Sequence, residues 1–189
     1  MRHIQSRIDE PAAYESFRRR RRGCLAGLLS WRRERTSVSP RLPRLELVWL
    51  PYYLICFRGQ SPAGEQTLTV SVQGHCGAFA VFQMHELLVE GDPPGPFFPP
   101  QMSESAAVLV GRKELVGTLL RVRSVRGSFT PEEMLSTEIV QYPYWIYYFL
   151  RRRKSIDFKT LDAVTGELAA SKLKSAVLSA FCATSEARS

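Results

Sequence analysis

The chain has 189 residues, of which 44% are hydrophobic and 11% aromatic, and its formal net charge at pH 7 is +8. This length fits one ordinary domain or two small ones, and the composition excludes a disordered chain. The positive charge is concentrated in residues 1–50, which contain twelve Arg, no Lys and five acidic residues. Because the remainder is nearly neutral, a uniform nucleic-acid-binding surface is not expected.

The four cysteines are widely spaced and none belongs to a CxxC pair. This spacing predicts neither a zinc ribbon nor a set of disulfides, so reduced thiols in a cytoplasmic protein are expected. His75–Cys76 is the best local candidate for metal binding, but a tetrahedral site needs a second pair of ligands. We therefore predict no metal and no cofactor.

The sequence shows no targeting or membrane-spanning segment. The apolar run at residues 23–31 is too short and too interrupted for a secretory signal. The longest apolar runs, residues 47–57 and 142–150, are far shorter than the ~20 residues that span a bilayer. We expect a cytoplasmic protein that could still attach to a membrane surface.

Residues 11–35 are predicted to form a basic amphipathic helix, since Tyr14, Phe17 and Leu28 recur at helical spacing. A solvated arm would explain this segment, but so would a contact with phospholipid head groups, nucleic acid or an acidic protein. The two prolines of residues 36–44 indicate a linker. The candidate polyanion-binding residues here are Arg18, Arg19, Arg20, Arg21, Arg22, Arg32 and Arg33.

Residues 45–59 are aromatic and β-branched, which predicts a strand. In residues 67–83, apolar and polar side chains alternate on both sides of a glycine-containing break, which predicts a hairpin. Five prolines in residues 91–101 exclude a helix or a central strand, so we place a domain boundary there.

The C-terminal half is predicted to begin with a helix at 103–125, although a strand is an alternative for the sequence LLRVRSV at 119–125. Thr130–Glu133 has the sequence of a helix start: Thr as the cap, Pro at the first position and Glu completing a capping box. An aromatic strand is predicted at 141–154, and a helix from about 170 to 182, where apolar residues fall on one helical face.

Both faces of the aromatic strand are apolar, so we expect it to be central and covered on both sides, by helices, a second sheet or another subunit. The candidate interface residues are Tyr52, Tyr53, Tyr144, Trp145, Tyr147 and Tyr148. A groove for a small molecule or peptide is one alternative. Stacking of nucleic-acid bases is another, because basic residues follow directly. These are Arg151, Arg152, Arg153 and Lys154.

The two halves of the chain share a pattern. "LPYYLICF" at 50–57 matches "YPYWIYYF" at 142–149, and "VQGHCGAF" at 72–79 matches "LDAVTGEL" at 161–168. The interval from Pro51 to Gly77 is 26 residues, and that from Pro143 to Gly166 is 23. Because a loop insertion between paired strands would produce this difference, the pattern predicts a tandem repeat.

Asp162 is expected to serve a turn. It ends a predicted strand, its carboxylate can accept backbone N–H groups, and Gly166 can adopt the left-handed conformation that a turn requires. Gly77 is its counterpart in the first half, where Gln73 replaces the aspartate. A catalytic carboxylate would not be expected to disappear while the turn remained.

The stretch "IDFKTLDAVTGEL" at 156–168 resembles the closing hairpin of PepSY-type domains, which are small α/β units with an Asp-Ala-x-Thr-Gly turn. The resemblance covers most of the C-terminal half and, more weakly, the N-terminal one. It implies a binding or inhibitory module rather than a catalyst. Members of that family are usually exported or membrane-tethered, and the first repeat lacks the Asp and the Thr.

The sequence predicts an α+β protein with two similar antiparallel strand-hairpin units and flanking helices, preceded by a basic N-terminal helix. We assign residues 1–44 to a basic arm and linker, 45–102 to the first unit, and 103–189 to a helix, the second unit and a C-terminal helix.

No nucleophile, zinc or phosphate motif surrounds the three histidines. We expect a non-catalytic binding or scaffold protein that associates with a protein partner or itself. The alternatives are a nucleic-acid-binding protein, which would use the arginines and segment 142–154, and an enzyme with an unrecognised site.

Overall fold

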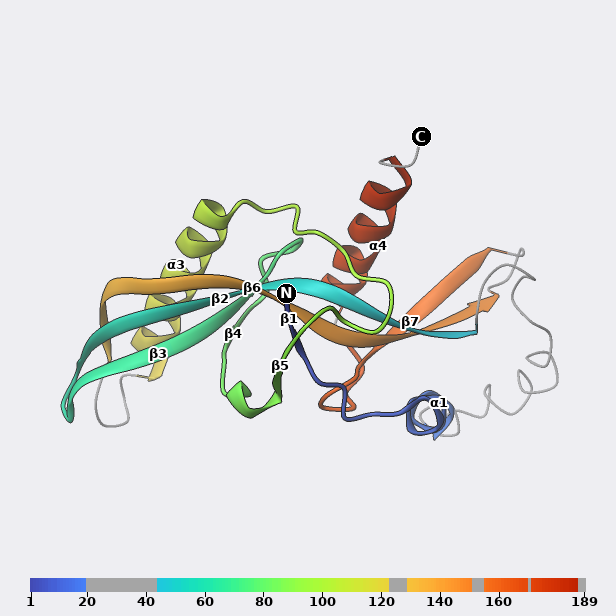
Figure 1. Cartoon of the computed structure of the whole chain (residues 1–189), viewed down its shortest axis with the longest axis horizontal. Helices are drawn as coiled ribbons and strands as arrows, with labels where there is room; N and C mark the ends of the chain where they lie inside the picture. The colour runs from blue at the N-terminus through green and yellow to red at the C-terminus, as the bar shows by residue number, and fades with distance from the viewer. Residues whose placement is uncertain (20–43, 123–128, 151–154, 170, 187–189) are drawn as a thin grey trace.

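A computed structural model describes residues 1–19, 44–122, 129–150, 155–169 and 171–186. Its elements are helices and the strands of a mostly antiparallel sheet (Figure 1), which confirms the α+β class. In order they are β1 (Arg2–Ile4), α1 (Glu10–Arg19), β2 (Leu45–Ser61), β3 (Gly64–Gln73), β4 (Phe79–Val81), the 3₁₀ helix η2 (His85–Leu87), β5 (Leu88–Glu90), α3 (Glu104–Val122), β6 (Thr130–Leu150), β7 (Ile156–Asp162) and α4 (Ser171–Glu186).

The seven strands form one mixed sheet in the order β4-β3-β2-β6-β1-β5, and β7 also pairs with β6. At its centre the long strands β2 and β6 run antiparallel, from the pair Leu45↔Tyr147 to the pair Gln60↔Thr130. Two antiparallel hairpins, β2–β3 and β6–β7, extend from this ribbon in opposite directions (Figure 1). The strand-hairpin units that the sequence predicts therefore share one sheet.

Helices cover the sheet in a way that follows the alternation of side chains along each strand. Tyr53, Ile55 and Phe57 of β2 pack under α3. Trp145 and Tyr147 of β6 pack against α1, whereas the intervening side chains of that strand pack under α4. Helices α1 and α4 consequently lie on opposite sides of the β6–β7 hairpin (Figure 1).

The aromatic part of β6 lies in the interior, as its two apolar faces predict. Every side chain from Val140 to Tyr148 is buried. Burial on both faces needs cover on both faces, and in this structure the cover comes from helices of the same chain.

The helix start predicted at Thr130–Glu133 is wrong, since these residues begin β6. Pro131 lies opposite Gly59 of β2, and Glu133 lies opposite Arg58, to which its carboxylate is paired. Pairing with β2 therefore outweighs the local capping sequence, as tertiary contacts often outweigh local helix preferences.

Residues 1–19 are an integral part of the fold, whereas the sequence suggests a separable arm. Ile4 of β1 and Ala13 of α1 have no exposed surface, and Phe17 is 3% exposed. Only the first part of the predicted helix at 11–35 lies within the described residues, as α1. The C-terminal helix extends to Glu186, slightly beyond its predicted end.

Candidate protein-binding surface

The turns that follow β3 and β7 are built in the same way. The Asp162 carboxylate Oδ1 accepts the backbone N–H groups of Val164 and Thr165, at 2.8 and 2.9 Å. The Gln73 side-chain Oε1 accepts those of His75 and Cys76, both at 2.7 Å. In each turn a glycine with positive φ donates its N–H to the carbonyl of the capping residue: Gly166 (φ 74°) to Asp162 and Gly77 (φ 65°) to Gln73.

The same correspondence extends to the segments that lead into α1 and α3. The carbonyl of Ala163 accepts N–H groups from Arg7 and Ile8, and the carbonyl of Gly74 accepts those of Gln101 and Met102. An aromatic side chain completes each contact: Trp145 Nε1 donates to the Ile8 carbonyl at 2.8 Å, and the Tyr53 hydroxyl donates to the Met102 carbonyl at 2.6 Å. The segment before each helix is thus bound by the hairpin of the other half.

The tyrosine hydroxyls of the interior are bonded to groups of the same chain. Tyr52 and Tyr144 share a hydrogen bond of 2.6 Å, and Tyr142 donates to both carboxylate oxygens of Asp162, at 3.0 and 2.9 Å. Burial raises the pKa of Tyr52, Tyr142 and Tyr144, and the Asp162 carboxylate raises that of Tyr142 further. These hydroxyls are neutral at physiological pH, and they hold β2, β6 and the β7 turn together.

The aromatic candidates for an interface face inward. Tyr53, Tyr144, Trp145, Tyr147 and Tyr148 are each at most 8% exposed, and Tyr52 is half-buried. In this structure they pack the two halves of the chain against each other, and the five buried rings are not available for stacking with a partner or a nucleic-acid base.

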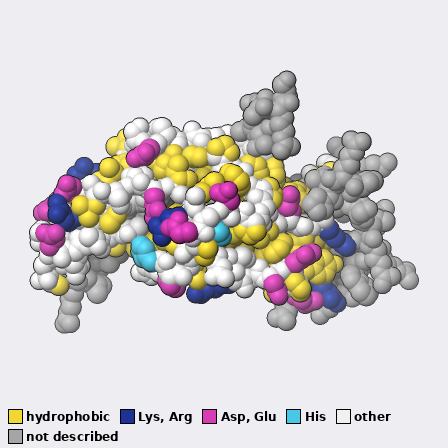
Figure 2. Space-filling model, viewed as in Figure 1, with side chains coloured by type: hydrophobic (Ala, Val, Ile, Leu, Met, Phe, Trp, Pro, Cys, Tyr) yellow, Lys and Arg dark blue, Asp and Glu magenta, His cyan; other side chains and the backbone are white. Residues whose placement is uncertain are grey.

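Most of the basic candidates lie outside the described residues: Arg20, Arg21, Arg22, Arg32, Arg33, Arg151, Arg152, Arg153 and Lys154. Arg18 ends α1 close to Glu15, with 3.1 Å between the guanidinium and the carboxylate. Arg19 is the last residue of that helix. Elsewhere, on the face seen in Figure 2, acidic and basic side chains are interspersed around a band of apolar ones.

The described residues contain no group of three or more His, Cys, Asp or Glu side chains that could hold a metal ion. His75, half of the sequence-based metal candidate, lies in the turn after β3, where burial lowers the pKa of its imidazole. Among the described helices, none has the length and hydropathy that a bilayer span requires.

Helix α3 exposes apolar side chains on the side that faces away from the sheet. Ala107 and Leu115 have no exposed surface, whereas Leu109 is 70%, Val116 40% and Leu120 55% exposed. At 100° per residue, the three exposed side chains fall within an arc of about 40°. We call this the outer face of α3 and define it by Leu109, Arg112, Lys113, Val116 and Leu120.

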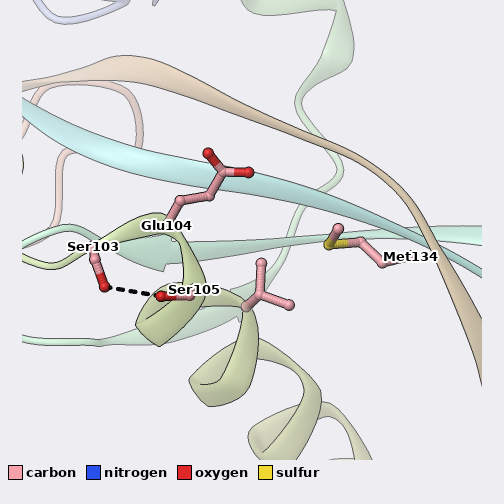
Figure 3. A pocket seen from close by; sticks show the side chains of 5 residues that line it. Ser103, Glu104, Ser105 and Met134 are labelled. Atoms are coloured by element: carbon pink, nitrogen blue, oxygen red, sulfur yellow. Dashed lines mark hydrogen bonds between the residues drawn. The ribbon is translucent and has the colours of Figure 1, made fainter.

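A shallow groove adjoins the N-terminal end of α3 (Figure 3). It has a volume of about 640 Å³ and is lined by Ser103, Glu104, Ser105, Val108 and Met134. The Ser103 and Ser105 hydroxyls are 3.2 Å apart (Figure 3). Its lining thus combines polar side chains of the first turn of α3 with the apolar Val108 of α3 and Met134 of β6.

The first part of β6 is an edge of the sheet, but its sequence and register disfavour pairing with another strand. Residues 130–139 pair with β2 on one side, and β1 joins the other side only from Val140. Pro131, acidic side chains and two irregularities in the β2–β6 register interrupt this edge. Prolines, charges and bulges are the usual protection of edge strands, so we assign no binding role to it.

Sequence reasoning missed the outer face of α3, although it predicted the helix. The prediction for residues 103–125 named a helix and did not separate its apolar positions into faces. The available signal was that Leu109, Val116 and Leu120 recur at intervals of seven and four residues, in addition to the buried set. A helix that is apolar on two faces buries both of them only if it packs against a second surface in addition to the sheet.

Comparisons of the chain with protein-family models, curated proteins and solved structures gave no match.

Proposed function

We propose that the protein is a non-catalytic binding module or scaffold that holds a protein partner on the outer face of α3. The observation that carries this proposal is the exposure of Leu109, Val116 and Leu120 on a helix whose opposite face is fully packed. An apolar stripe left in water on a folded protein is a frequent mark of an interaction surface.

The first part of β6 also exposes apolar side chains. Met134, which lines the groove next to Val108, is 43% exposed, and Leu135 and Ile139 are 46% and 41% exposed. The hydroxyls of Tyr52, Tyr142 and Tyr144, by contrast, are hydrogen-bonded within the chain. Binding at the surface is the function that these two properties favour together.

We also infer that the chain arose by internal duplication and that its two units have exchanged their helices. Support comes from the paired hydrogen bonds: the turn glycines, the capping side chains Gln73 and Asp162, and the carbonyls that bind the segments before α1 and α3. In this arrangement each helix covers the other unit's hairpin. Because each helix packs on the hairpin of the other unit, the two units hold each other in place, as a scaffold requires.

The arginine cluster at 18–22 would provide a second contact in this proposal, with an acidic protein or an acidic membrane surface. Its support is the sequence alone, since five adjacent cations favour a polyanion. Attachment through this cluster would be weakened by salt, whereas the apolar contact of α3 would not.

In-cell photocrosslinking tests the proposal. A photoactivatable residue replaces Leu109 or Leu120, and a third version carries it at Leu178 of α4, which is 48% exposed and serves as the matched control. We expect the same discrete protein adduct from both α3 positions and none from Leu178. The adduct from position 120 should disappear when Leu109→Asp is added, while circular dichroism and the Tm stay unchanged.

Two results would contradict it. One is equal labelling from all three positions, which indicates random collisions. The other is an absence of adducts from α3 in cells that contain the folded protein.

A further inference from the structure

The charges around the outer face of α3 identify the kind of partner that fits it; this inference rests on the proposed function. Arg112 and Lys113 are exposed and lie on either side of the apolar stripe, at about −60° and +40° from Leu109 on the helical wheel. Arg121 is also exposed, but it lies about 120° from Leu109 around the helix, outside this pair. The stripe therefore has a basic rim made by Arg112 and Lys113.

These three cations have no carboxylate partner among the described residues. Other surface cations do: Arg58 is paired with Glu133, Arg2 with Glu138, and Lys174 with Asp157. The acidic residue nearest to Arg112 and Lys113 in sequence, Glu114, is half-buried and lies about 140° from Leu109 around the helix. The charge of the outer face is thus left for a partner to neutralise.

The shape of the surface favours a helix as the partner. From Leu109 to Leu120 the stripe covers about 16 Å, or three helical turns, at 1.5 Å per residue. Its spacing of seven and then four residues is that of apolar positions that meet a second helix side by side.

A second copy of the chain fits this surface poorly. If two α3 helices packed antiparallel with Leu109 opposite Leu120, Lys113 of each copy would lie opposite Val116 of the other, about 4.5 Å along the axis from the second Lys113. The Arg112 and Lys113 cations of both copies would then be gathered near the centre of the contact, where desolvation makes like charges costly.

We propose that the outer face of α3 binds an amphipathic helix of a partner protein, with acidic residues on both sides of that helix's apolar seam. The apolar seam would cover Leu109, Val116 and Leu120. Its flanking Glu or Asp carboxylates would pair with Arg112 and Lys113 at the rim.

A peptide selection tests this partner chemistry. The probe is a displayed library of 18-residue helical peptides with leucine fixed at the seam and either Glu or Lys at each flanking position. The full-length protein is the bait, in its natural form and as the double variant Arg112→Glu/Lys113→Glu. We expect Glu to be enriched at least fivefold at the flanking positions with the natural chain, and Lys to be enriched with the double variant.

Direct binding of one selected Glu-flanked peptide supplies the second measurement. Leu109→Gln/Leu120→Gln should weaken binding at least tenfold, and Leu178→Gln on α4 should leave it within twofold. Reversal of the charge preference cannot come from unfolding, because an unfolded bait would lose selectivity instead of exchanging it.

Any of three outcomes would overturn the inference. They are equal enrichment of Glu and Lys, retained affinity in Leu109→Gln/Leu120→Gln, and a concentration-dependent dimer of the chain that protects α3 from labelling. The inference would also fail if the protein showed no peptide selectivity but bound vesicles rich in phosphatidylserine, and if Arg112→Glu/Lys113→Glu abolished that binding. The surface would then be assigned to a membrane.

A photocrosslinked partner that contacts α3 through a neutral or non-helical segment would refute this inference and leave the proposed function intact.

Discussion

The tyrosine hydroxyls show how single residues connect the two halves of this protein. Tyr52 lies in β2 and Tyr144 in β6, at corresponding positions of the two hairpins, and their hydroxyls meet at 2.6 Å. Each ring also packs against Tyr142. A buried hydroxyl without a partner destabilises a protein, so a change at one of these positions affects the other.

The raised tyrosine pKa values predict alkaline unfolding. Burial keeps Tyr52, Tyr142 and Tyr144 protonated in the folded chain at a pH where the unfolded chain, with tyrosine pKa values near 10, has already lost those protons. The free energy of unfolding should therefore be independent of these residues below about pH 9. Above about pH 10 it should fall, by about 1.4 kcal/mol per pH unit for each tyrosine.

Denaturant titrations between pH 8 and 11 measure this slope. Tyr144→Phe removes one titrating group, so its slope should be shallower by about 1.4 kcal/mol per pH unit, whatever its stability at neutral pH. A slope equal to that of the unaltered chain would show that Tyr144 ionises freely in the folded state.

Among the structural elements, the turn after β7 combines a local signal with a long-range contact. Its Asp162 cap and its left-handed Gly166 follow from turn chemistry that the sequence displays. Its contact with the segment before α1, through the Ala163 carbonyl, joins residues more than 150 positions apart. No local pattern in the sequence contains that contact.

Two glycine substitutions distinguish the effect of backbone conformation on stability from the effect of side-chain packing. Gly166→Ala places a side chain at φ 74°, where the nearest atom of the fold is still 3.6 Å from the new Cβ, so the expected loss of about 1–2 kcal/mol comes from the backbone. Gly117→Ala in α3 meets only the tip of Arg121, at 3.9 Å. It should stabilise the chain by about 0.5–1 kcal/mol.

Thermal and denaturant unfolding of both variants provide the measurement. If Gly166→Ala proved neutral while Gly117→Ala stabilised the chain, the left-handed conformation at residue 166 would be wrong.

The strands and helices could be predicted where local periodicity and burial agree. The aromatic segment of β6, the hairpin beyond β2 and the helix α3 all follow from alternation or helical spacing. Thr130–Glu133 could not be predicted in this way, because its partner Arg58 lies 75 residues away from Glu133. The outer face of α3 was recoverable in principle, but a single sequence does not say which of two apolar stripes faces the sheet.

At the scale of the whole molecule, a helix from each half of the chain packs on the strands of the other half. The N-terminal half supplies α1 to Trp145 and Tyr147, and the C-terminal half supplies α3 to Tyr53, Ile55 and Phe57. The deeply buried residues Ile4 and Phe17 belong to the same arrangement. Neither half has a complete core of its own.

A cut in the proline-rich connection tests this exchange. A protease site inserted after Gly91, whose added Cβ would meet nothing within 4 Å, should be cleaved without loss of structure. The fragments 1–91 and 92–189 should elute together in size-exclusion chromatography and separate only in denaturant. Leu115→Ala leaves a cavity under α3 and costs about 2–5 kcal/mol, so it should lower the denaturant concentration at which they separate.

Fragments that separated in native buffer would show that each half folds alone. The contacts of α1 and α3 with the strands of the other half would then contribute little to stability.

The long ribbon of β2 and β6 also has a consequence for how the chain is made on the ribosome. β2 is complete at Ser61, but its central neighbour ends only at Leu150. At about 5–20 residues per second, the emerging N-terminal half waits roughly 5–20 seconds with its most apolar strand unpaired on that side. During this interval the unpaired edge of β2 exposes the nascent chain to aggregation, which is the hazard that chaperones counter.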